Sequence, residues 1–524
     1  MQRRAGAACL TAWARTSYLG ADGPPTDPGV TVSARRTFIT ALLVTLSLLL
    51  GAGCGGSAGR GGSSGASLIR PDALVFVSID SDLGSSQWQK VNDLSKKFPG
   101  RRLALAMLQQ SLAKNHIDYN DDVKPAVGLE VDLAIVLGPN LNDAAVVGLT
   151  KPDDAGKFKA LVKKLNETDS SGQPAVYREV NGWYALSDSQ AHIDEVLKGG
   201  GKSLSDESTY NDALGKLPSS ALVKAYVSGP QLAKVIQQFQ QAKGSGLAGT
   251  TPGLTKLDFI SAALSAENDG LRVHGATGGA GSSDLASGNY ESKLLDGVPA
   301  DALAFLSFRG GKGIDQLRSQ FETNPTFSQA LPQIERALGV KLADVLALLR
   351  GEVAFYMRPG GALPEGTLAI GTDDQSAALS TLDKLASRLA ALMQAKVTTT
   401  HEAGHAVKTI DFTRFAVRYA GLGDKILITT GLNGIGAYTA SGSKLPDAAD
   451  FKEAKSASGM PSSNAGFAYV DLKNAIALAE SLSGLAGSSL PPKVAENLRP
   501  LRSFIAWGDR SGDAFTFDAF LEIK

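Results

Sequence analysis

The segment Asp72-Ala73-Leu74-Val75-Phe76-Val77-Ser78 recurs, 229 residues further along the chain, as Asp301-Ala302-Leu303-Ala304-Phe305-Leu306-Ser307. In the first copy the side chains alternate as in a β-strand, so that Leu74, Phe76 and Ser78 point opposite to Val75, Val77 and Ile79. Each copy is therefore predicted to begin a unit that opens on a half-buried strand.

Two further pairs of segments match in the same order. Pro218-Ser219-Ser220 with the later Ala225-Tyr226-Val227 returns as Pro461-Ser462-Ser463 with Ala468-Tyr469-Val470, and Ser245-Gly246-Leu247-Ala248-Gly249 returns unchanged from Ser483 to Gly487. Their spacings are close to the first one. We therefore predict two tandem homologous repeats, residues 68–275 and 298–524, joined by a Gly- and Ser-containing linker over residues 276–297.

Each predicted repeat interleaves short strands and helices. Asp153-Asp154 and Asp373-Asp374 follow predicted strands and suit the N-caps of helices. After the second pair, leucines repeat at helical spacing, at Leu379, Leu382, Leu385, Leu389 and Leu392. Short strands separated by turns and helices indicate an α+β fold in which each repeat is a mainly antiparallel sheet with packed helices.

The most apolar run, residues 38–50, lies near the N-terminus between Arg35-Arg36 and Cys54. Its 13 residues are fewer than the roughly 20 that span a bilayer, so residues 1–53 are interpreted as a secretory signal region that is cut before Cys54. Residues 1–34 fit no signal and indicate an over-extended start. The twin arginines leave the general secretory and the twin-arginine export routes both open.

The leader resembles a bacterial lipoprotein signal, although Gly51 stands where such signals usually carry Leu. The resemblance implies that Cys54 is acylated and begins the mature chain, with residues 54–67 as a Gly/Ser tether. Together with the recurring Asp-Ala-Leu strands and the Ala-Tyr-Val segments, this leader resembles a family of uncharacterised bacterial envelope lipoproteins, catalogued as a domain of unknown function. That resemblance implies a location and a fold, but no activity and no site residues.

One motif has the letters of a zinc protease, His401-Glu402-Ala403-Gly404-His405. In that chemistry the two histidines share one face of a helix and bind Zn²⁺, and the glutamate activates the metal-bound water. Here β-branched residues precede the motif and an alternating segment follows it, so both flanks favour strands. We interpret the motif as a polar loop between a helix and a strand, and predict no catalytic or metal-binding residues and no cofactor.

The charge balance narrows the functional class. The chain has 52 Lys and Arg against 52 Asp and Glu, which argues against nucleic acid as a partner. Removal of residues 1–53 leaves Cys54 as the one cysteine. We expect a membrane-anchored, extracytoplasmic lipoprotein that is not an enzyme and serves in binding or as a scaffold. Two alternatives stay open, a carrier that encloses lipid or another apolar ligand, and a zinc hydrolase built on His401, Glu402 and His405.

Overall fold

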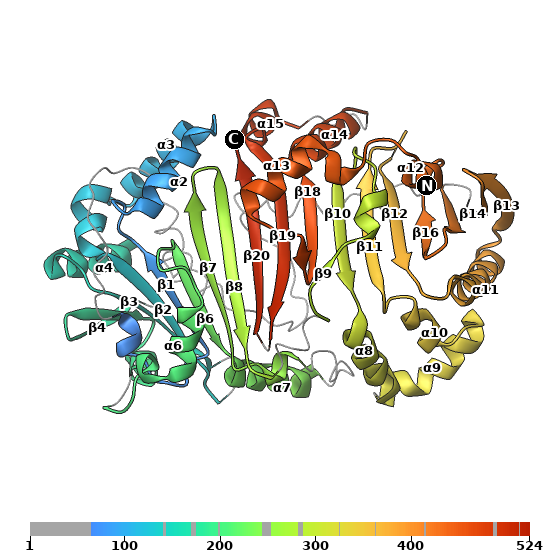
Figure 1. The fold of residues 1–524 in the computed structure, drawn as a ribbon. Coiled ribbons are helices and arrows are strands. Elements are labelled where there is room, and N and C mark those ends of the chain that lie inside the picture. Colours follow the sequence, from blue (N-terminus) through green and yellow to red (C-terminus); the bar gives the residue numbers. More distant parts are fainter. Residues whose placement is uncertain are drawn as a thin grey trace, which may run out of the picture. The chain divides into compact units, whose positions relative to one another are not determined.

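The computed structural model describes residues 64–139, 143–168, 174–197, 200–243, 253–280, 287–323, 325–361, 363–412, 415–485, 490–512 and 514–524. Strands and helices alternate along these residues (Figure 1), which confirms the predicted α+β class. Within the same residues, no helix is long and apolar enough to cross a membrane.

Eighteen strands of the described chain form one sheet. The first half of the chain contributes β1 (Val75–Asp80), β2 (Glu130–Val136), β3 (Ala145–Thr150), β4 (Val176–Val180), β5 (Trp183–Ser187), β6 (Val223–Ser228), β7 (Phe259–Glu267) and β8 (Gly270–Gly278). The second half contributes β10 (Ala304–Arg309), β11 (Glu352–Arg358), β12 (Glu365–Gly371), β13 (Lys396–Glu402), β14 (His405–Asp411), β15 (Ala416–Gly421), β16 (Lys425–Thr429), β18 (Gly466–Asp471), β19 (Leu501–Ser511) and β20 (Ala514–Ile523). A separate pair joins β9 (Tyr290–Glu291) to β17 (Ser463–Asn464).

The strands pair side by side in the order β4-β5-β3-β2-β1-β6-β7-β8-β20-β19-β18-β10-β11-β12-β16-β15-β14-β13, and all of these pairings are antiparallel. The antiparallel prediction is therefore confirmed, but the two halves share one sheet rather than forming two. They meet at β8 and β20, where His274 and Asp518 form an ion pair of 2.9 Å. Outward from this seam, β8, β7, β6, β1, β2 and β3 are matched in order by β20, β19, β18, β10, β11 and β12.

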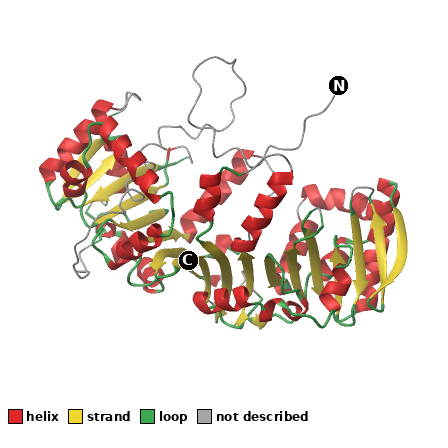
Figure 2. Cartoon of the chain, turned by 90° about the horizontal axis from the view of Figure 1, so that it is seen from above, coloured by secondary structure: helices red, strands yellow, loops and turns green. Residues whose placement is uncertain are grey.

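Helices lie on both sides of the strands, as Figure 2 shows from above. The first half contains α2 (Ser86–Lys96), α3 (Arg101–Lys114), α4 (Ala155–Thr168), α5 (Gln190–Val196), α6 (Ser208–Gly215) and α7 (Gly229–Lys243). The second half contains α8 (Gly311–Thr323), α9 (Pro325–Leu338), α10 (Leu342–Ala347), α11 (Gln375–Met393), α12 (Gly434–Thr439), α13 (Ala449–Ser458), α14 (Leu472–Leu485) and α15 (Pro492–Leu498). Asp154 and Asp374 accept backbone N–H bonds at the starts of α4 and α11, as predicted.

One face of the sheet, which we call the charged face, carries the ionisable residues of its central strands. Its two main cores form where helices cover it. In the first half, the Phe76 ring packs edge-on against Tyr210 of α6. In the second half, Tyr469 packs edge-on against Phe451 of α13. The predicted alternation of residues 74–79 is confirmed by the register, since Phe76 lies beside Ala134 and Tyr226 on this face and Val77 lies beside Leu133 and Ala225 on the other.

The opposite face, which we call the uncharged face, is formed by apolar residues that lie in register across the same strands. One row runs through Leu133, Val77, Ala225, Ala262, Gly275 and Phe517, and a second row runs through Ala519, Ala506, Ala468, Leu306, Phe355 and Leu368. Helix α2 packs over the ends of the β7 and β8 strands on this face, and α11 packs over β12 and β16. Between these two helices most of its residues are half-buried, and Leu306 and Phe355 are 43% and 38% exposed.

In each half, a buried carboxylate fastens a short 3-10 helix to the charged face. Oδ2 of Asp132 on β2 accepts the N–H of Gly65 in η1 (Gly65–Ser67) at 2.9 Å. Glu352 on β11 accepts the N–H groups of Lys293 and Leu294 beside η8 (Leu294–Gly297) at 3.0 and 3.3 Å. Burial and the neighbouring Glu130 carboxylate raise the pKa of Asp132 well above its usual range.

Some of the predicted boundaries fall inside these elements. The last residues of the predicted tether, 65–67, form η1, in which Ala66 is fully buried. Within the predicted linker 276–297, the structure describes the end of β8, then β9 and η8. The predicted leucine face of α11 is partly wrong, because the buried residues are Ala378, Ala386 and Ala390, while Leu389 and Leu392 are exposed. Small alanine side chains allow a helix to approach a sheet closely.

Candidate functional site

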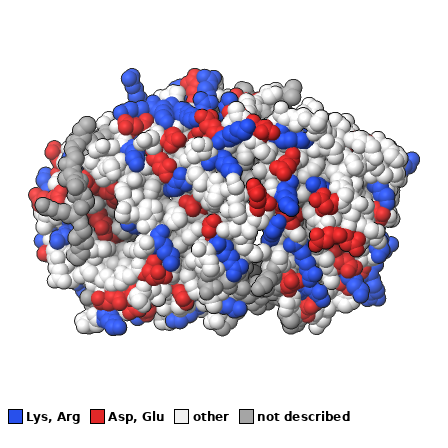
Figure 3. All heavy atoms as spheres, in the orientation of Figure 1, with Lys and Arg blue, Asp and Glu red and all other residues white. Residues whose placement is uncertain are grey.

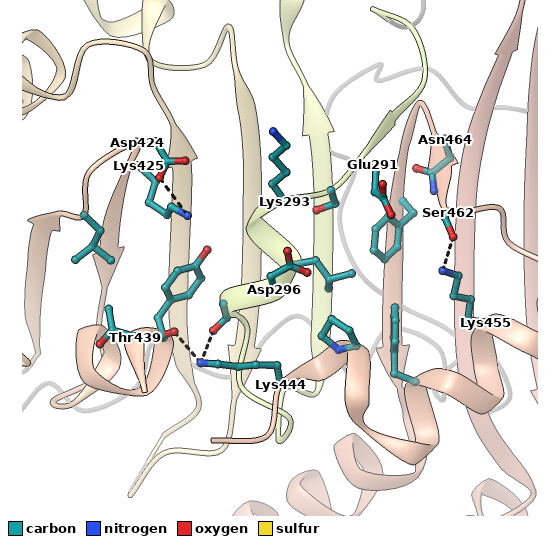
Figure 4. Close-up of a pocket in the computed structure, with 18 of the residues that line it drawn as sticks. Glu291, Lys293, Asp296, Asp424, Lys425, Thr439, Lys444, Lys455, Ser462 and Asn464 are labelled. Carbon is teal, nitrogen blue, oxygen red and sulfur yellow. Dashed lines mark hydrogen bonds and ion pairs between the residues drawn. The ribbon is translucent and has the colours of Figure 1, made fainter. Parts of the chain in front are cut away.

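A groove of about 1170 Å³ opens on the charged-face side of the second half. Its walls come from the segment between β9 and η8, from α12, from η9 (Leu445–Asp447) and from α13. Figure 4 shows it running from Asp424 and Lys425 at one end to Ser462 and Lys455 at the other, with Lys293 and Asp296 between them.

The middle of the groove is built around two residues that bind backbone carbonyls. Nζ of Lys444 donates to the carbonyl oxygens of Gly297 at 3.2 Å, Ala437 at 3.2 Å and Tyr438 at 2.7 Å. The hydroxyl of Tyr438, a residue only 5% exposed, donates to the carbonyl of Leu294 at 2.9 Å. Burial lowers the pKa of Lys444 and raises that of Tyr438. Both side chains therefore hold η8 against α12.

The rim carries charges of both signs. Lys425 lies 3.2 Å from Asp424, and Nζ of Lys455 donates to the hydroxyl of Ser462 at 3.0 Å. Lys293 and Asp296 are exposed. Figure 3 shows the same interspersed pattern over this side of the molecule. Mixed charges around an aromatic floor suit the binding of a polar partner, because each charge can be matched without a large single-sign field.

The zinc-protease letters lie on a β-hairpin rather than on a helix or in the predicted loop. Strands β13 and β14 are joined by Ala403 and Gly404, whose φ angles of 50° and 82° form the tight turn. His401 pairs with Ala406, and Glu402 pairs with His405. The two imidazoles therefore project from opposite faces of the hairpin and cannot bind one zinc ion as the protease motif does.

Glu402 instead holds the hairpin to its neighbours. Its carboxylate accepts a hydrogen bond from Nη1 of Arg418 at 2.8 Å and another from the N–H of Gly436, in the first turn of α12, at 2.6 Å. The two ion-paired side chains are 12% and 14% exposed. Among the described residues, no group of three His, Cys, Asp or Glu side chains could hold a metal ion.

Variants at these positions are expected to differ in stability. Glu402→Gln leaves the Arg418 guanidinium without its counter-charge, and we expect a loss of about 2 kcal/mol in the free energy of unfolding. His401→Ala, on an exposed position, should change it by no more than about 0.5 kcal/mol. Urea unfolding measures both. Two results together would contradict this structural role. The two variants would lose equal stability, and added zinc would stabilise the parent but neither variant.

The sequence did not reveal the groove. Its wall residues come from four separate segments, 291–297, 405, 422–446 and 451–467, and none of these carries a recognisable motif. Of the three residues of the zinc-hydrolase alternative, His405 lines the groove, and His401 and Glu402 lie in the same hairpin. Cys54 lies outside the described residues.

Comparison with known proteins identifies a family for this chain but gives no informative individual relative. No curated protein matches the chain significantly. A solved structure titled "Structure of crystal form I of TP0453" is similar at 11% identity with a TM-score of 0.22, over 44% of this chain and 90% of that one, which is too weak to support an argument. A family model matches residues 37–521, nearly the whole chain. The chain therefore belongs to the family described as "Protein of unknown function (DUF3352)".

Proposed function

We propose that this chain is a lipoprotein of the bacterial cell envelope, anchored outside the cytosol by acyl chains on Cys54, and that its body binds a partner without catalysing a reaction. The groove in the second half carries the proposal. It is large, but the buried Tyr438 and the half-buried Lys444 of its floor already bind backbone carbonyls. Because these bonds occupy both groups, neither is free to act as an acid or a base, and both shape a binding surface instead.

The chemistry of the groove favours a polar segment of another protein as the partner. Lysines and carboxylates alternate along the rim, and the buried rings of Phe451 and Phe467 lie at one wall. Interfaces of this kind combine an aromatic centre with a polar, solvent-exposed rim. The exposed charges of Lys293 and Asp296 would then set the orientation of the partner.

The distance from Cys54 to the body supports an anchored function. Ser64 lies ten positions after Cys54, and an extended chain spans at most about 35 Å over that length. Ser64 caps η1 by accepting the N–H of Ala66, and η1 is held by Asp132. Acyl chains, each CH₂ of which contributes about 0.8 kcal/mol on insertion, would therefore keep the body near the bilayer.

Two measurements test the proposal. Intact-mass spectrometry of protein extracted from membranes should find a chain that begins at Cys54 and carries acyl groups. An uncut chain with a bare thiol would contradict the anchor. For the groove, the charge reversal Lys293→Glu with Lys455→Glu should weaken the binding of a partner identified by crosslinking at Ser462 at least fivefold, and the control Lys234→Glu on α7 should not. Equal binding by the two variants would exclude the groove as the binding site.

We also infer that the two halves arose by tandem duplication. The order of their central strands supports this, and so do the two 3-10 helices η1 and η8, each held by a buried carboxylate from the second strand of its half. Isolated bridges add a further correspondence, since Ile69 pairs with Leu197 in the first half and Pro299 pairs with Lys444 in the second. Each bridge joins the segment before the first strand to the segment after a short helix.

A further inference from the structure

The two faces of the sheet divide their side chains in an unusual way. Antiparallel sheets with one face in water normally turn polar residues toward the solvent and apolar residues toward the core. Here the ionisable residues of the central strands, among them Asp132, Arg272 and Glu352, lie on the face that helices cover. The half-buried and exposed residues of the uncharged face are apolar. Arg510, at the end of β19, is in register with this face but lies beside the turn to β20.

The uncharged face is large for a surface of this composition. Its two rows extend across the eleven strands from β2 to β12, which are ten strand spacings of about 4.8 Å each. Contiguous apolar patches of more than a few hundred Å² on soluble proteins mark binding sites for proteins, membranes or ligands. Leu306, Phe308 and Phe355 lie on two adjacent strands and are 43%, 39% and 38% exposed, so this part of the face is directly accessible.

We propose that the uncharged face binds the acyl chains of lipids. Its central rows offer neither a charge nor a side-chain hydrogen-bond donor, and the strand backbones are paired with one another. A protein partner would place polar groups against such a surface without satisfying them, whereas a hydrocarbon chain has none to satisfy. The tether adds a second reason, because the nine residues between Cys54 and Ser64 would keep the face close to a bilayer that supplies lipid.

This inference differs from an enclosed carrier. The acyl chains would lie along an open sheet surface, against the aromatic rings of β10, β11 and β20 and over the small residues between them. The ring of Phe517 already lies against Gly275, where a Cβ atom would collide with it, so large and small side chains interlock on this face. The inference rests on the proposed binding role of the body, but it concerns the sheet face and not the groove.

The experiment uses the full chain purified from membranes, with cis-parinaric acid, a fatty acid whose fluorescence rises in apolar surroundings, as the probe. We expect saturable binding by the parent protein. The double variant Leu306→Gln with Phe355→Gln should weaken that binding at least tenfold, because two adjacent side chains of the face become polar. The control Leu432→Gln changes an apolar residue that is 81% exposed in a loop, and it should bind within twofold of the parent.

Several outcomes would overturn the inference. One is the absence of saturable binding by the parent, and another is equal binding by the double variant and the control. A parent dimer that the double variant dissociates, without probe binding, would assign the face to a second copy of the chain. If the double variant melts earlier than the parent, Leu306→Gln alone replaces it and should still weaken binding at least threefold. Intact-mass spectrometry tests the acylation of Cys54 separately, so a failure of the proposed anchor can be told apart from a failure of lipid binding by the uncharged face.

Discussion

Replacing Cys54 with Ala is expected to move the body from the membrane fraction to the soluble extracytoplasmic fraction. The reason is that the proposed anchor consists of acyl chains on this thiol, and within the described residues no helix could replace it as a membrane span. Without acyl chains the body has no excess of basic residues that would attract anionic lipids, and we expect the uncharged face alone not to hold it in the membrane. Fractionation followed by immunoblotting, with a size standard for the uncut chain, measures the change.

Cys9→Ala is the matched control for this variant. Cys9 lies in the region that we expect to be removed before Cys54, so its replacement should leave the distribution unchanged. If the Cys54→Ala protein stays in the membrane at the size of the uncut chain, the apolar run 38–50 and not lipid is the anchor. If it stays there at the mature size, a surface of the body holds it, and the uncharged face would be the first surface to examine.

The sequence predicted elements better than it predicted their arrangement. The alternation of residues 74–79 gave the strand and both of its faces, because side-chain direction in a strand follows from a period of two. The helix starts at Asp154 and Asp374 could also be predicted from neighbouring residues alone, since an N-cap is a contact between one side chain and the first turn of the helix that follows it. Period alone could not tell which face the helices would cover, because that depends on contacts between distant segments.

The joining of the two halves into one sheet and the position of the groove both depend on contacts between segments that are distant in the sequence, so neither could be predicted from local patterns. Pairing of β8 with β20 brings together residues that lie 238 to 252 positions apart, and neither strand carries a mark of its partner. The groove collects polar residues from segments that each look like an ordinary loop. For α11, the leucine spacing was only partly right, because Leu379 and Leu382 pack against the core but the close approach of the helix to the sheet buries alanines such as Ala386 and Ala390 instead of Leu389 and Leu392. The size of the side chains, and not their apolar character alone, determined which face of α11 packs against the sheet.

Glu352→Ala is expected to destabilise the second half of the body strongly. The carboxylate accepts four hydrogen bonds, from the hydroxyls of Ser292 at 2.5 Å and Ser307 at 3.1 Å and from the N–H groups of Lys293 and Leu294. Glu352 is 7% exposed, so its removal leaves buried donors without acceptors. At about 1–3 kcal/mol for each donor left unsatisfied, we expect a loss of at least about 3 kcal/mol in the free energy of unfolding.

Urea unfolding followed by circular dichroism measures this loss. Glu352→Gln is the matched control, because its amide oxygen can still accept some of the four bonds, and it should lose less than half as much stability as the alanine variant. Hydrogen exchange should locate the damage to η8 and to the groove that its backbone helps to build. A loss below about 1 kcal/mol in Glu352→Ala would mean that water replaces the carboxylate, and that the site is open to solvent.

Asp132 is the corresponding carboxyl group of the first half, and its replacement by Asn is expected to stabilise the protein at pH 7 rather than destabilise it. Asp132 is fully buried, and its Oδ1 lacks a hydrogen-bond partner. Its pKa is raised by burial and by Glu130, so the folded protein keeps a proton that the unfolded chain releases near pH 4. Stability from this group therefore falls as the pH rises from about 4 through the raised pKa. Asp132→Asn, which stays neutral and can still accept the Gly65 N–H, should flatten that fall and gain stability at pH 7. An unchanged pH slope would contradict the raised pKa of Asp132.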